Sequence, residues 1–298
     1  MNSLYAATVG FFDGVHIGHR FLIDQLKTEA APRGLKTMLI TFGTHPRKVL
    51  HDSFQPQLLT SYDEKLRLLK SSGVDRVEVL DFTLEMARMT AQEFISDVLA
   101  ERLNVKLLLV GHDHRFGRNR EDGFPEYKAY GQQTGMEVIQ ATRFSTGHQN
   151  HISSSVIRKL IENGRMKEAG ELLGYEYTFT GKVVSGYQVG RKIGFPTANL
   201  QVEPAEKLIP GTGVYAVEVE WQHRRFTGMM NIGYRPTLDN AHQLSVEVHI
   251  FDFQEDIYHQ QLKIRFLYKI RDEKKFDSLD ALILQLKDDK TVVLNNLQ

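Results

Sequence analysis

The sequence predicts an α/β domain with a doubly wound parallel sheet, followed by a small antiparallel β-barrel with a C-terminal helix. Three observations lead to this fold class. The first half alternates strand-like apolar runs with helical stretches, the second half places strand after strand with few residues between them, and 298 residues suffice for two domains of ordinary size. We expect residues 1–173 to form the first domain and residues 174–298 the second.

The chain opens with a strand, a glycine loop and a helix. Residues 6–9 are small and apolar, Gly10 and Gly14 follow in a loop, and apolar residues then recur at helical spacing. The first turn of a helix has unpaired N–H groups and a partial positive charge, so a loop that leads into it can hold a phosphate. His16 and His19 would lie beside that anion.

Further strand-like runs continue the first domain, with helical stretches between them. They are residues 36–42, 76–82, 105–111 and 136–142. Ser61 with Glu64, and Thr90 with Glu93, have the spacing of capping boxes ahead of apolar stripes. Strands joined by helical crossovers predict a parallel sheet, whose ligands bind beyond the carboxyl ends of the strands. The glycine loop lies at such an end.

The second domain has a different order of predicted secondary-structure elements. After a helical stretch at residues 154–174, strand-like runs with short connections imply antiparallel pairing. These runs are residues 177–186, 213–221, 224–233, 244–253 and 262–270. We expect a hairpin turn at Gln222 and His223, and a final helix capped at Ser278. The pattern predicts a small barrel.

Composition limits the partners. Lysine plus arginine equals aspartate plus glutamate at 37 each, so no global basic field points to nucleic acid. The chain has no cysteine, which excludes disulfides and thiolate metal sites and agrees with a reducing compartment. No apolar run approaches the length of a membrane span, and the first residues lack the pattern of a signal peptide. We expect a soluble, cytoplasmic protein that binds neither nucleic acid nor membrane.

The two histidines alone are weak evidence for a site, since histidines often pack or cap. Their setting, directly after a strand and at a helix start, favours the binding of nucleotide phosphates. Zinc binding is the lesser alternative. No thiolate accompanies His16 and His19, and the glycines are better explained by close approach of the backbone to an anion.

The stretch GFFDGVHIGH, residues 10–19, resembles the His-x-Gly-His loop of nucleotidylyltransferases, in the form found in bacterial bifunctional riboflavin kinase/FMN adenylyltransferases. Three further stretches fit that family in order: TFGTHPRKVL, GHDHRFGRNREDG and ISSSVIR. The resemblance implies a Rossmann-like domain in which His16 and His19 contact the phosphates of ATP. It also implies phosphate-binding residues in the loop and at a second helix start, namely Gly10, Phe12, Gly14, Gly18, Ser153, Ser154 and Arg158.

Some residues of this domain have alternative explanations. Ser153 and Ser154 would equally cap the helix that follows them. Asp13 suits a magnesium ligand, and equally a turn residue that bonds its own backbone. The sequence also departs from the family, which usually has an aromatic residue where His114 stands and a proline where Thr44 stands.

A second motif is GYQVGRKIGFPTANL, residues 186–200. In the plainer interpretation it is a glycine loop followed by a proline turn into a strand. Thr197 and Asn199 alternate on one side of an extended chain, so their oxygens could reach one cation. Gly186 and Gly190 allow the backbone to approach phosphates. The segment is thus a candidate magnesium and nucleotide site.

This segment closely resembles the riboflavin kinase signature, G-x-x-x-G-R-x-x-G-F-P-T-A-N. Later parts of that family follow in order: PGTGVYAV, NIGYRPT, VEVHIFDF and IRDEKKFDSL. One departure is Ser185, which replaces a histidine common in the family. The resemblance implies that Thr197 and Asn199 bind Mg²⁺-ATP. It implies nucleotide contacts from Gly186, Gly190 and Arg191.

The resemblance also implies a general base. The glutamate of the EVH strand, here Glu247, would take the proton of the ribityl hydroxyl that attacks the γ-phosphate. Without the resemblance, alternation places Glu247 on a solvent face opposite Val246 and Val248. Arg271 and Phe276 match flavin-binding positions, with a salt bridge and a core aromatic as the alternatives.

Taken together, the resemblance implies a bifunctional enzyme of flavin cofactor biosynthesis. The second domain would phosphorylate riboflavin to FMN, and the first would transfer the adenylyl group of ATP to FMN, releasing FAD and pyrophosphate. Each step would use Mg²⁺. The alternatives are a single-activity enzyme with one inactive domain and a flavin-binding regulator. The intact candidate residues of both domains argue against these alternatives.

Overall fold

The computed structural model of the chain describes residues 3–50, 55–112, 114–144, 152–186, 189–235 and 243–296. The chain forms two compact units, Met1–Ser154 and Ser155–Gln298, and each is described by itself. Within the described ranges, no helix combines the length and apolar character needed to cross a membrane.

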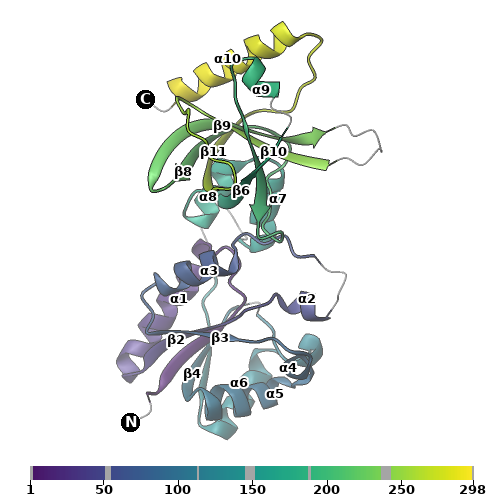
Figure 1. Cartoon of the computed structure of the whole chain (residues 1–298). Helices are drawn as coiled ribbons and strands as arrows, with labels where there is room; N and C mark the ends of the chain where they lie inside the picture. Colours follow the sequence, from purple (N-terminus) through teal and green to yellow (C-terminus); the bar gives the residue numbers. More distant parts are fainter. Residues whose placement is uncertain are drawn as a thin grey trace. The chain divides into compact units, whose positions relative to one another are not determined.

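The first unit alternates strands and helices (Figure 1). In chain order its elements are β1 (Tyr5–Val9), α1 (Ile17–Ala30), η1 (Ala31–Arg33), β2 (Lys36–Phe42), α2 (Pro46–Leu50), α3 (Tyr62–Lys70), β3 (Arg76–Leu80), α4 (Leu84–Arg88), α5 (Ala91–Glu93), the π-helix η2 (Phe94–Arg102), β4 (Val105–Val110), η3 (Arg118–Arg120), α6 (Phe124–Thr134) and β5 (Glu137–Gln140).

The sheet of the first unit has the strand order β3-β2-β1-β4-β5, and each neighbouring pair is parallel. This arrangement confirms the predicted doubly wound sheet. The chain moves outward from β1 to β3 and then returns to the other side of β1 with β4. The crevice beyond the carboxyl ends of β1 and β4 is therefore the place where sheets of this kind bind ligands.

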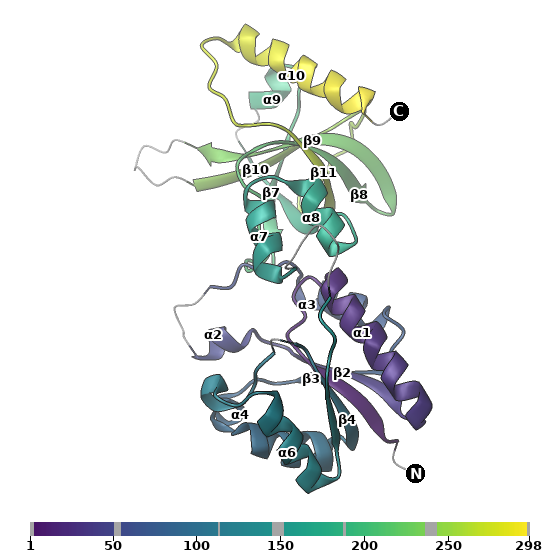
Figure 2. The ribbon, with the colours of Figure 1, turned by 180° about the vertical axis from the view of Figure 1, so that it is seen from behind.

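Two apolar cores lie on the two faces of this sheet. Figure 2 shows α1 on one face and α4 and α6 on the other. Ala6 packs with Leu26 of α1, whereas Met38 belongs to the core that contains Phe94 and Tyr127. Successive residues of a strand point to opposite faces, so the apolar run of a central strand supplies both cores.

The two predicted capping boxes are present. Ser61 Oγ accepts from the backbone N–H of Glu64 at 3.2 Å, and Glu64 Oε2 accepts from the N–H of Ser61 at 2.8 Å. Thr90 and Glu93 make the same pair of bonds at 3.1 and 2.7 Å. Each box satisfies amides that a helix start leaves without intrahelical partners, which explains why α3 and α5 begin where they do.

The chain continues through helices and six barrel strands. The elements are α7 (Ser154–Glu162), α8 (Met166–Leu173), β6 (Thr178–Val184), α9 (Val189–Lys192), β7 (Ala198–Glu203), β8 (Gly213–Trp221), β9 (Arg224–Arg235), β10 (Gln243–Ile250), β11 (Gln261–Arg271) and α10 (Leu279–Asn295).

The strands of the second unit close into a barrel in the order β10-β7-β6-β11-β8-β9. Every pair is antiparallel, which confirms the predicted barrel. The β8–β9 hairpin turns at Gln222 and His223, whose φ angles are 49° and 64°. Two positive φ angles match the type I′ turn, whose twist suits a two-residue hairpin.

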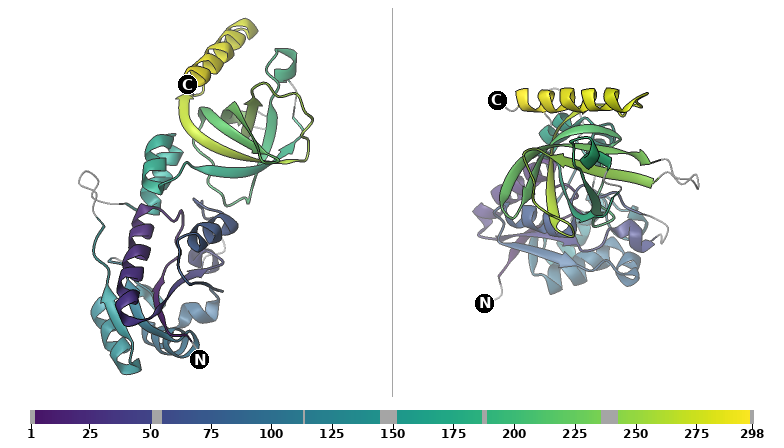
Figure 3. Two further views of the ribbon diagram at one scale, coloured as in Figure 1. Left: turned by 90° about the vertical axis from the view of Figure 1, so that its left-hand side faces the viewer. Right: turned by 45° about the horizontal axis from the view of Figure 1, so that its top comes forward.

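The C-terminal helix α10 lies across the barrel (yellow in Figure 3). Its start is capped as predicted, because Ser278 Oγ accepts from the N–H of Ala281 at 3.2 Å. Val293 joins Phe195 and Phe251 in one buried cluster. The helix therefore covers apolar surface that the barrel strands alone would leave in water.

Helices α7 and α8 pack with the barrel strands, in the second compact unit. The N–H of Gly211 donates to the carbonyl oxygen of Ile161 at 3.2 Å. A Cβ on Gly211 would collide with the carbonyl oxygen of Glu162, so only glycine allows α7 to approach this closely. In the sequence, the change from a helical to a strand-like pattern shows where the helices end. It does not show whether they pack against the first unit or against the barrel.

Candidate active sites

The loop after β1 leaves the sheet through unusual backbone angles. The N–H of Gly10 still donates to Ile40 O at 3.0 Å, at the end of the β1/β2 ladder. Phe12, Gly14 and Val15 then adopt φ angles of 56°, 80° and 37°. These left-handed angles turn the chain sharply into α1. The predicted glycine loop is thus brought to the N-terminus of a helix at the carboxyl end of β1.

His16 and His19 lie together at this helix start. Nδ1 of His16 accepts from the N–H of His19 at 3.3 Å, and the two rings stack with their centroids 3.6 Å apart. Gly18 permits this arrangement, since a Cβ there would lie 3.2 Å from Nδ1 of His16. Burial lowers the pKa of His16 to about 4 and the pKa of His19 well below its usual value. Both rings are neutral at pH 7 and remain able to donate to a phosphate.

Asp13 ties the loop to the segment that precedes α3. Asp13 is 4% exposed. Its carboxylate accepts from the N–H of Leu59 at 3.0 Å and from the N–H and hydroxyl of Thr60 at 3.1 and 3.2 Å. The hydroxyl of Thr60 in turn accepts from the N–H of Gly14 at 3.1 Å. This network favours a structural role for Asp13 over the magnesium-ligand alternative, because the carboxylate lone pairs already have donors.

The second phosphate segment meets the loop at Ser154. Its Oγ donates to the carbonyl oxygen of Asp13 at 3.0 Å, from the first position of α7. Ser153 precedes it directly and is half-buried. Arg158, the third predicted residue of this segment, belongs to the second compact unit. Its contact with the phosphates of the first unit stays a prediction.

In the barrel, the predicted base lies beside the predicted metal ligands. Glu247 of β10 pairs with Asn199 of β7 across the ladder. Thr197 Oγ1 donates to Glu247 Oε2 at 3.0 Å, and Ser245 Oγ donates to Glu247 Oε1 at 2.8 Å. Both carboxylate oxygens therefore accept from hydroxyl groups, which fixes the orientation of the carboxylate next to Thr197 and Asn199.

Gly186 and Gly190 of the second motif lie where a side chain would collide. A Cβ on Gly186 would overlap the amide of Asn199, and a Cβ on Gly190 would overlap the carbonyl oxygen of Phe195. The carbonyl oxygen of Gly190 accepts from the N–H of Phe195 at 2.9 Å, which closes a tight turn after α9. The loop can thus lie directly against Asn199.

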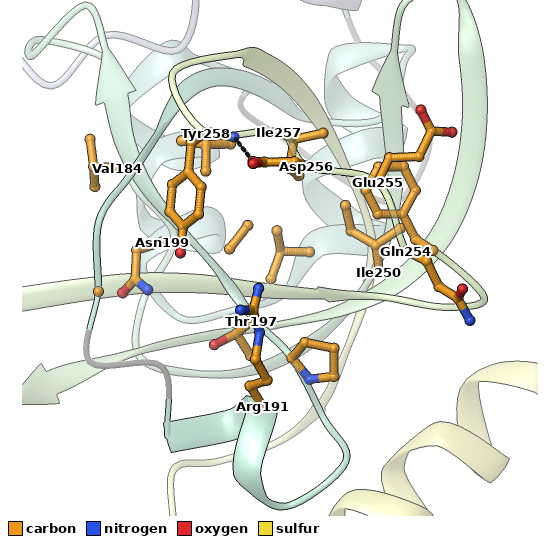
Figure 4. Close-up of a pocket in the computed structure, with 16 residues that line it drawn as sticks. Val184, Arg191, Thr197, Asn199, Ile250, Gln254, Glu255, Asp256, Ile257 and Tyr258 are labelled. Atoms are coloured by element: carbon orange, nitrogen blue, oxygen red, sulfur yellow. Dashed lines mark hydrogen bonds between the residues drawn. The ribbon is translucent and has the colours of Figure 1, made fainter.

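A pocket of about 360 Å³ opens beside these residues (Figure 4). Arg191, Thr197 and Asn199 line one side of it, and the ring of Tyr258 points toward Asn199 from the segment after β10. Asp256 Oδ1 accepts from the N–H of Tyr258 at 3.1 Å and holds that segment. The lining mixes apolar side chains with charged and polar ones, and the volume lies in the range typical of a small-ligand site.

Arg271, a predicted flavin residue, is paired with Asp289 of α10. Its Nε donates to Oδ1 at 3.0 Å and its Nη2 to Oδ2 at 2.8 Å, while Gln285 also donates to Oδ1 at 3.0 Å. The guanidinium carbon lies 5.7 Å from the centroid of the Phe276 ring. The salt-bridge alternative is therefore present, and the two predicted flavin residues lie together. Their contact with flavin stays a prediction.

Sequence reasoning missed several residues of the barrel site. Ser245 lies two positions before Glu247 on the same side of a strand, so alternation could have revealed it. Residues 253–258 line the pocket, and the only signal was an acidic and aromatic connection longer than a hairpin turn. His249 is 8% exposed, and its Nδ1 lies 2.7 Å from the carbonyl oxygen of Pro196. The face of β10 expected to meet solvent is therefore covered.

The oxygen donors fit magnesium that arrives with a nucleotide. In the part of the chain that the structure describes, no three His, Asp or Glu side chains are grouped to hold a metal ion. Mg²⁺ in kinase sites is held by one or two protein ligands together with substrate phosphates and water, so such a group is not required. The matched motifs also contain residues outside the described ranges, namely Asp113, Tyr187, Gln188, Pro236 and Thr237.

Comparison with known proteins gives the class of each part of the chain. Residues 2–156 match the family model of FAD synthetase, and residues 173–297 match that of riboflavin kinase. The fold and its two sites thus define a protein that combines a nucleotidyl-transfer domain with a flavin kinase domain.

Relatives that match nearly the whole chain identify the particular family within this class. The proteins of Escherichia coli K12, Listeria monocytogenes and Bacillus subtilis are 39%, 37% and 34% identical to it. In each case the match covers 95% of this chain, and it covers 90%, 89% and 89% of the respective relative. All three are named bifunctional riboflavin kinase/FMN adenylyltransferase. The chain belongs to this family, which confirms the resemblance found in the sequence.

A solved structure is similar to this chain over nearly its whole length. It has a TM-score of 0.88 at 35% identity, and the match covers 99% of this chain and 95% of the other. Its title describes a macrolide-efflux protein from Streptococcus pneumoniae. The likeness supports the fold described above for both units.

Proposed function

We propose that the barrel transfers the γ-phosphoryl group of ATP to riboflavin, giving FMN, and that the first unit transfers the adenylyl group of ATP to FMN, giving FAD and pyrophosphate. The observation that carries the proposal is the 3.0 Å hydrogen bond from Thr197 to Glu247. It joins a proposed nucleotide-binding residue to the proposed base beside a pocket of suitable size.

In the kinase reaction, Glu247 acts as the general base. The ribityl hydroxyl must lose its proton as its oxygen attacks the γ-phosphorus, and the carboxylate accepts that proton. Ser245 and Thr197 hold the carboxylate by its two oxygens at 2.8 and 3.0 Å. When the substrate hydroxyl approaches, it competes with Thr197 for one of these oxygens, and Thr197 is released toward the nucleotide.

Mg²⁺ is the proposed cofactor of both reactions. Thr197 Oγ1 and Asn199 Oδ1 are the oxygens that would hold it with ATP in the barrel, and the missing Cβ of Gly186 leaves the amide of Asn199 its space. When bound, the ion neutralises charge that develops on the phosphate oxygens.

In adenylyl transfer, the protein's role is to position and stabilise charge. The attacking FMN phosphate is already anionic, so no protein base is needed, and negative charge grows on the departing pyrophosphate. His16, His19, Ser153, Ser154 and the first amides of α1 are proposed to donate to that charge. A neutral His16, with its pKa of about 4, donates without adding a buried cation beforehand.

The proposed adenylyltransferase domain spans residues 1–173, because its phosphate motif continues to Arg158 beyond the first compact unit. The proposed riboflavin kinase domain spans residues 174–298. Both reactions consume ATP, which supports a cytoplasmic location.

The direct test is chromatography of the products formed from riboflavin, ATP and Mg²⁺. We expect FMN to appear first and FAD to follow, and FMN supplied with ATP to give FAD without riboflavin. If FMN were the final product, the chain would have riboflavin kinase activity but no adenylyltransferase activity. The absence of both products would favour a flavin-binding regulator. Chelation of the metal is expected to stop both steps.

Thr197→Ala and Asn199→Ala are expected to weaken the use of Mg²⁺-ATP in riboflavin phosphorylation. Each removes an oxygen donor to a charged complex, an interaction worth about 1.5 to 3 kcal/mol, so kcat/KM should fall roughly 10- to 100-fold. The measurement is a titration of rate against Mg²⁺ and ATP, with FAD formation from FMN as an internal reference.

Thr180→Ala on the neighbouring strand β6 is the matched control, since it removes a half-buried hydroxyl outside the site. It should leave the Mg²⁺ and ATP dependence unchanged. Wild-type dependence in both Thr197→Ala and Asn199→Ala would remove this turn from the nucleotide site.

A further inference from the structure

A third imidazole lies in the region beyond the carboxyl ends of β1 and β4, which we call the crevice. His114 follows β4, and its N–H donates to the carbonyl oxygen of Gly111 at 3.0 Å. A Cβ on Gly111 would lie 3.4 Å from Cβ of His114 and 4.0 Å from Cδ2 of Leu22 in α1. His114 therefore lies near the first turns of the helix that begins beside His19, at the reversal point of the sheet, where ligands bind.

Two ring nitrogens in this crevice are buried and unpaired. Among the described residues, neither Nδ1 of His19 nor Nε2 of His114 has a hydrogen-bond partner. Buried polar atoms in folded proteins nearly always have one, so each exception needs an explanation. Both atoms lie in the crevice, near the end of the proposed phosphate-binding loop, residues 10–19. A ligand that brings acceptor oxygens would satisfy both.

The electrostatic surroundings suit an anionic ligand. Burial and, to a lesser extent, the charge of Arg120 together lower the pKa of His114 to about 4. His114 also adds to the lowering of the pKa of His19, whose other charged neighbour is His16. Both imidazoles, those of His19 and His114, are therefore neutral at pH 7, and the charge that acts on His114 is the positive charge of an arginine. A neutral imidazole carries one N–H that can donate to an oxyanion.

We propose that His114 is a further substrate-binding residue of the adenylyl-transfer site, whose Nε2–H donates to a phosphate oxygen of ATP and of the departing pyrophosphate. This inference rests on the proposed function, because it takes the loop of His16 and His19 as the phosphate site. It adds a donor from the opposite side of the crevice, after β4. The triphosphate would then be held between two loops rather than by the helix start alone.

A packing role for His114 makes the opposite prediction. If the ring only fills space, replacing it should lower stability and leave phosphate binding intact. The substitution His114→Phe keeps a ring in the crevice and removes the unpaired polar atom. Under the proposal, Nε2 of His114 binds a ligand and has no structural role in its absence. The ligand-free protein should then melt at the same temperature or higher, while anion binding weakens. In His114→Phe the melting temperature should therefore stay the same or rise, while the affinity for the anion falls.

The test measures pyrophosphate binding to the full chain by calorimetry, together with the melting temperature of the ligand-free protein. For His114→Phe we expect the Kd of pyrophosphate to rise about 10- to 100-fold, the range for a lost hydrogen bond to a charged group. His114→Gln, which restores an N–H donor, should recover part of the loss. Riboflavin phosphorylation should be unchanged in both variants.

His112→Gln is the matched control, since this exposed side chain lies on the same loop. It should bind pyrophosphate as the wild type does. Equal losses in His112→Gln and His114→Phe, or wild-type binding in His114→Phe, would overturn the proposal. So would a lower melting temperature in His114→Phe with no recovery in His114→Gln.

Failure of this inference can be separated from failure of the proposed function. If His19→Ala blocks FAD formation from FMN while His114→Phe does not, the phosphate site stands and only the third imidazole is excluded. If both variants form FAD at the wild-type rate, the phosphate site itself is misplaced.

Discussion

Glu247→Gln is expected to lower the rate of riboflavin phosphorylation by about 10² to 10⁴, or roughly 3 to 5 kcal/mol of barrier. Glutamine keeps the shape of the side chain and one acceptor oxygen for Ser245 or Thr197, but it cannot take the proton of the ribityl hydroxyl. The measurement compares FMN formed from riboflavin with FAD formed from supplied FMN. The second rate should stay at the wild-type value.

Glu220→Gln is the control for loss of one negative charge from the barrel. Glu220 lies on β8 and forms a surface pair with Lys263, at 3.7 Å. Pairs of this kind contribute little, so the variant should phosphorylate riboflavin normally. If Glu247→Gln stopped FAD formation from supplied FMN in a folded protein, the assignment of separate sites to the two units would fail.

His19→Ala is expected to have the reverse effect. It removes a donor to the phosphates, and by analogy with the loss of one oxyanion donor this costs on the order of 10² to 10³ in turnover of FMN to FAD. Riboflavin phosphorylation should continue. The assay supplies FMN and ATP directly and measures FAD and pyrophosphate, and the kinase rate of the same sample reports that the chain is folded.

His112→Ala serves as the control, because it removes an exposed imidazole of the same unit. It should form FAD at the wild-type rate. Undiminished FAD formation by His19→Ala would mean that the helix start of α1 does not hold the reacting phosphates.

Local patterns were sufficient to predict most of the fold. Alternation along β10 predicted the inward face of Val246 and Val248, which are 5% and 0% exposed. The two residues between β8 and β9 predicted a tight hairpin, and the helical crossovers predicted parallel strands. Each of these inferences depends on neighbours within a few residues, where periodicity and turn geometry are informative.

The features that escaped prediction depend on partners far along the chain. Asp13 receives its hydrogen bonds from Leu59 and Thr60, and Arg271 is paired with Asp289 on a later helix. Periodicity cannot join such pairs. His249 is buried because another segment, at Pro196, lies over its strand. The motifs located the two candidate sites, but only the packed chain brings Ser245 to Glu247. Only the packed chain, in its described part, also shows two ring nitrogens without partners near the loop of residues 10–19.

Because α7 and α8 pack against the barrel, the chain is difficult to divide into two fragments that each carry one reaction. A fragment that ended after residue 173 would carry both helices away from Gly211 and expose Ile157 and Ile161, which are fully buried in the intact chain. A fragment that ended after residue 154 would leave Arg158 behind. If Arg158 binds phosphate as proposed, neither cut leaves both fragments with a complete core and a complete site. We expect single substitutions to remove one reaction at a time. Placing the two reactions on separate chains would require this pair of helices to be present in both.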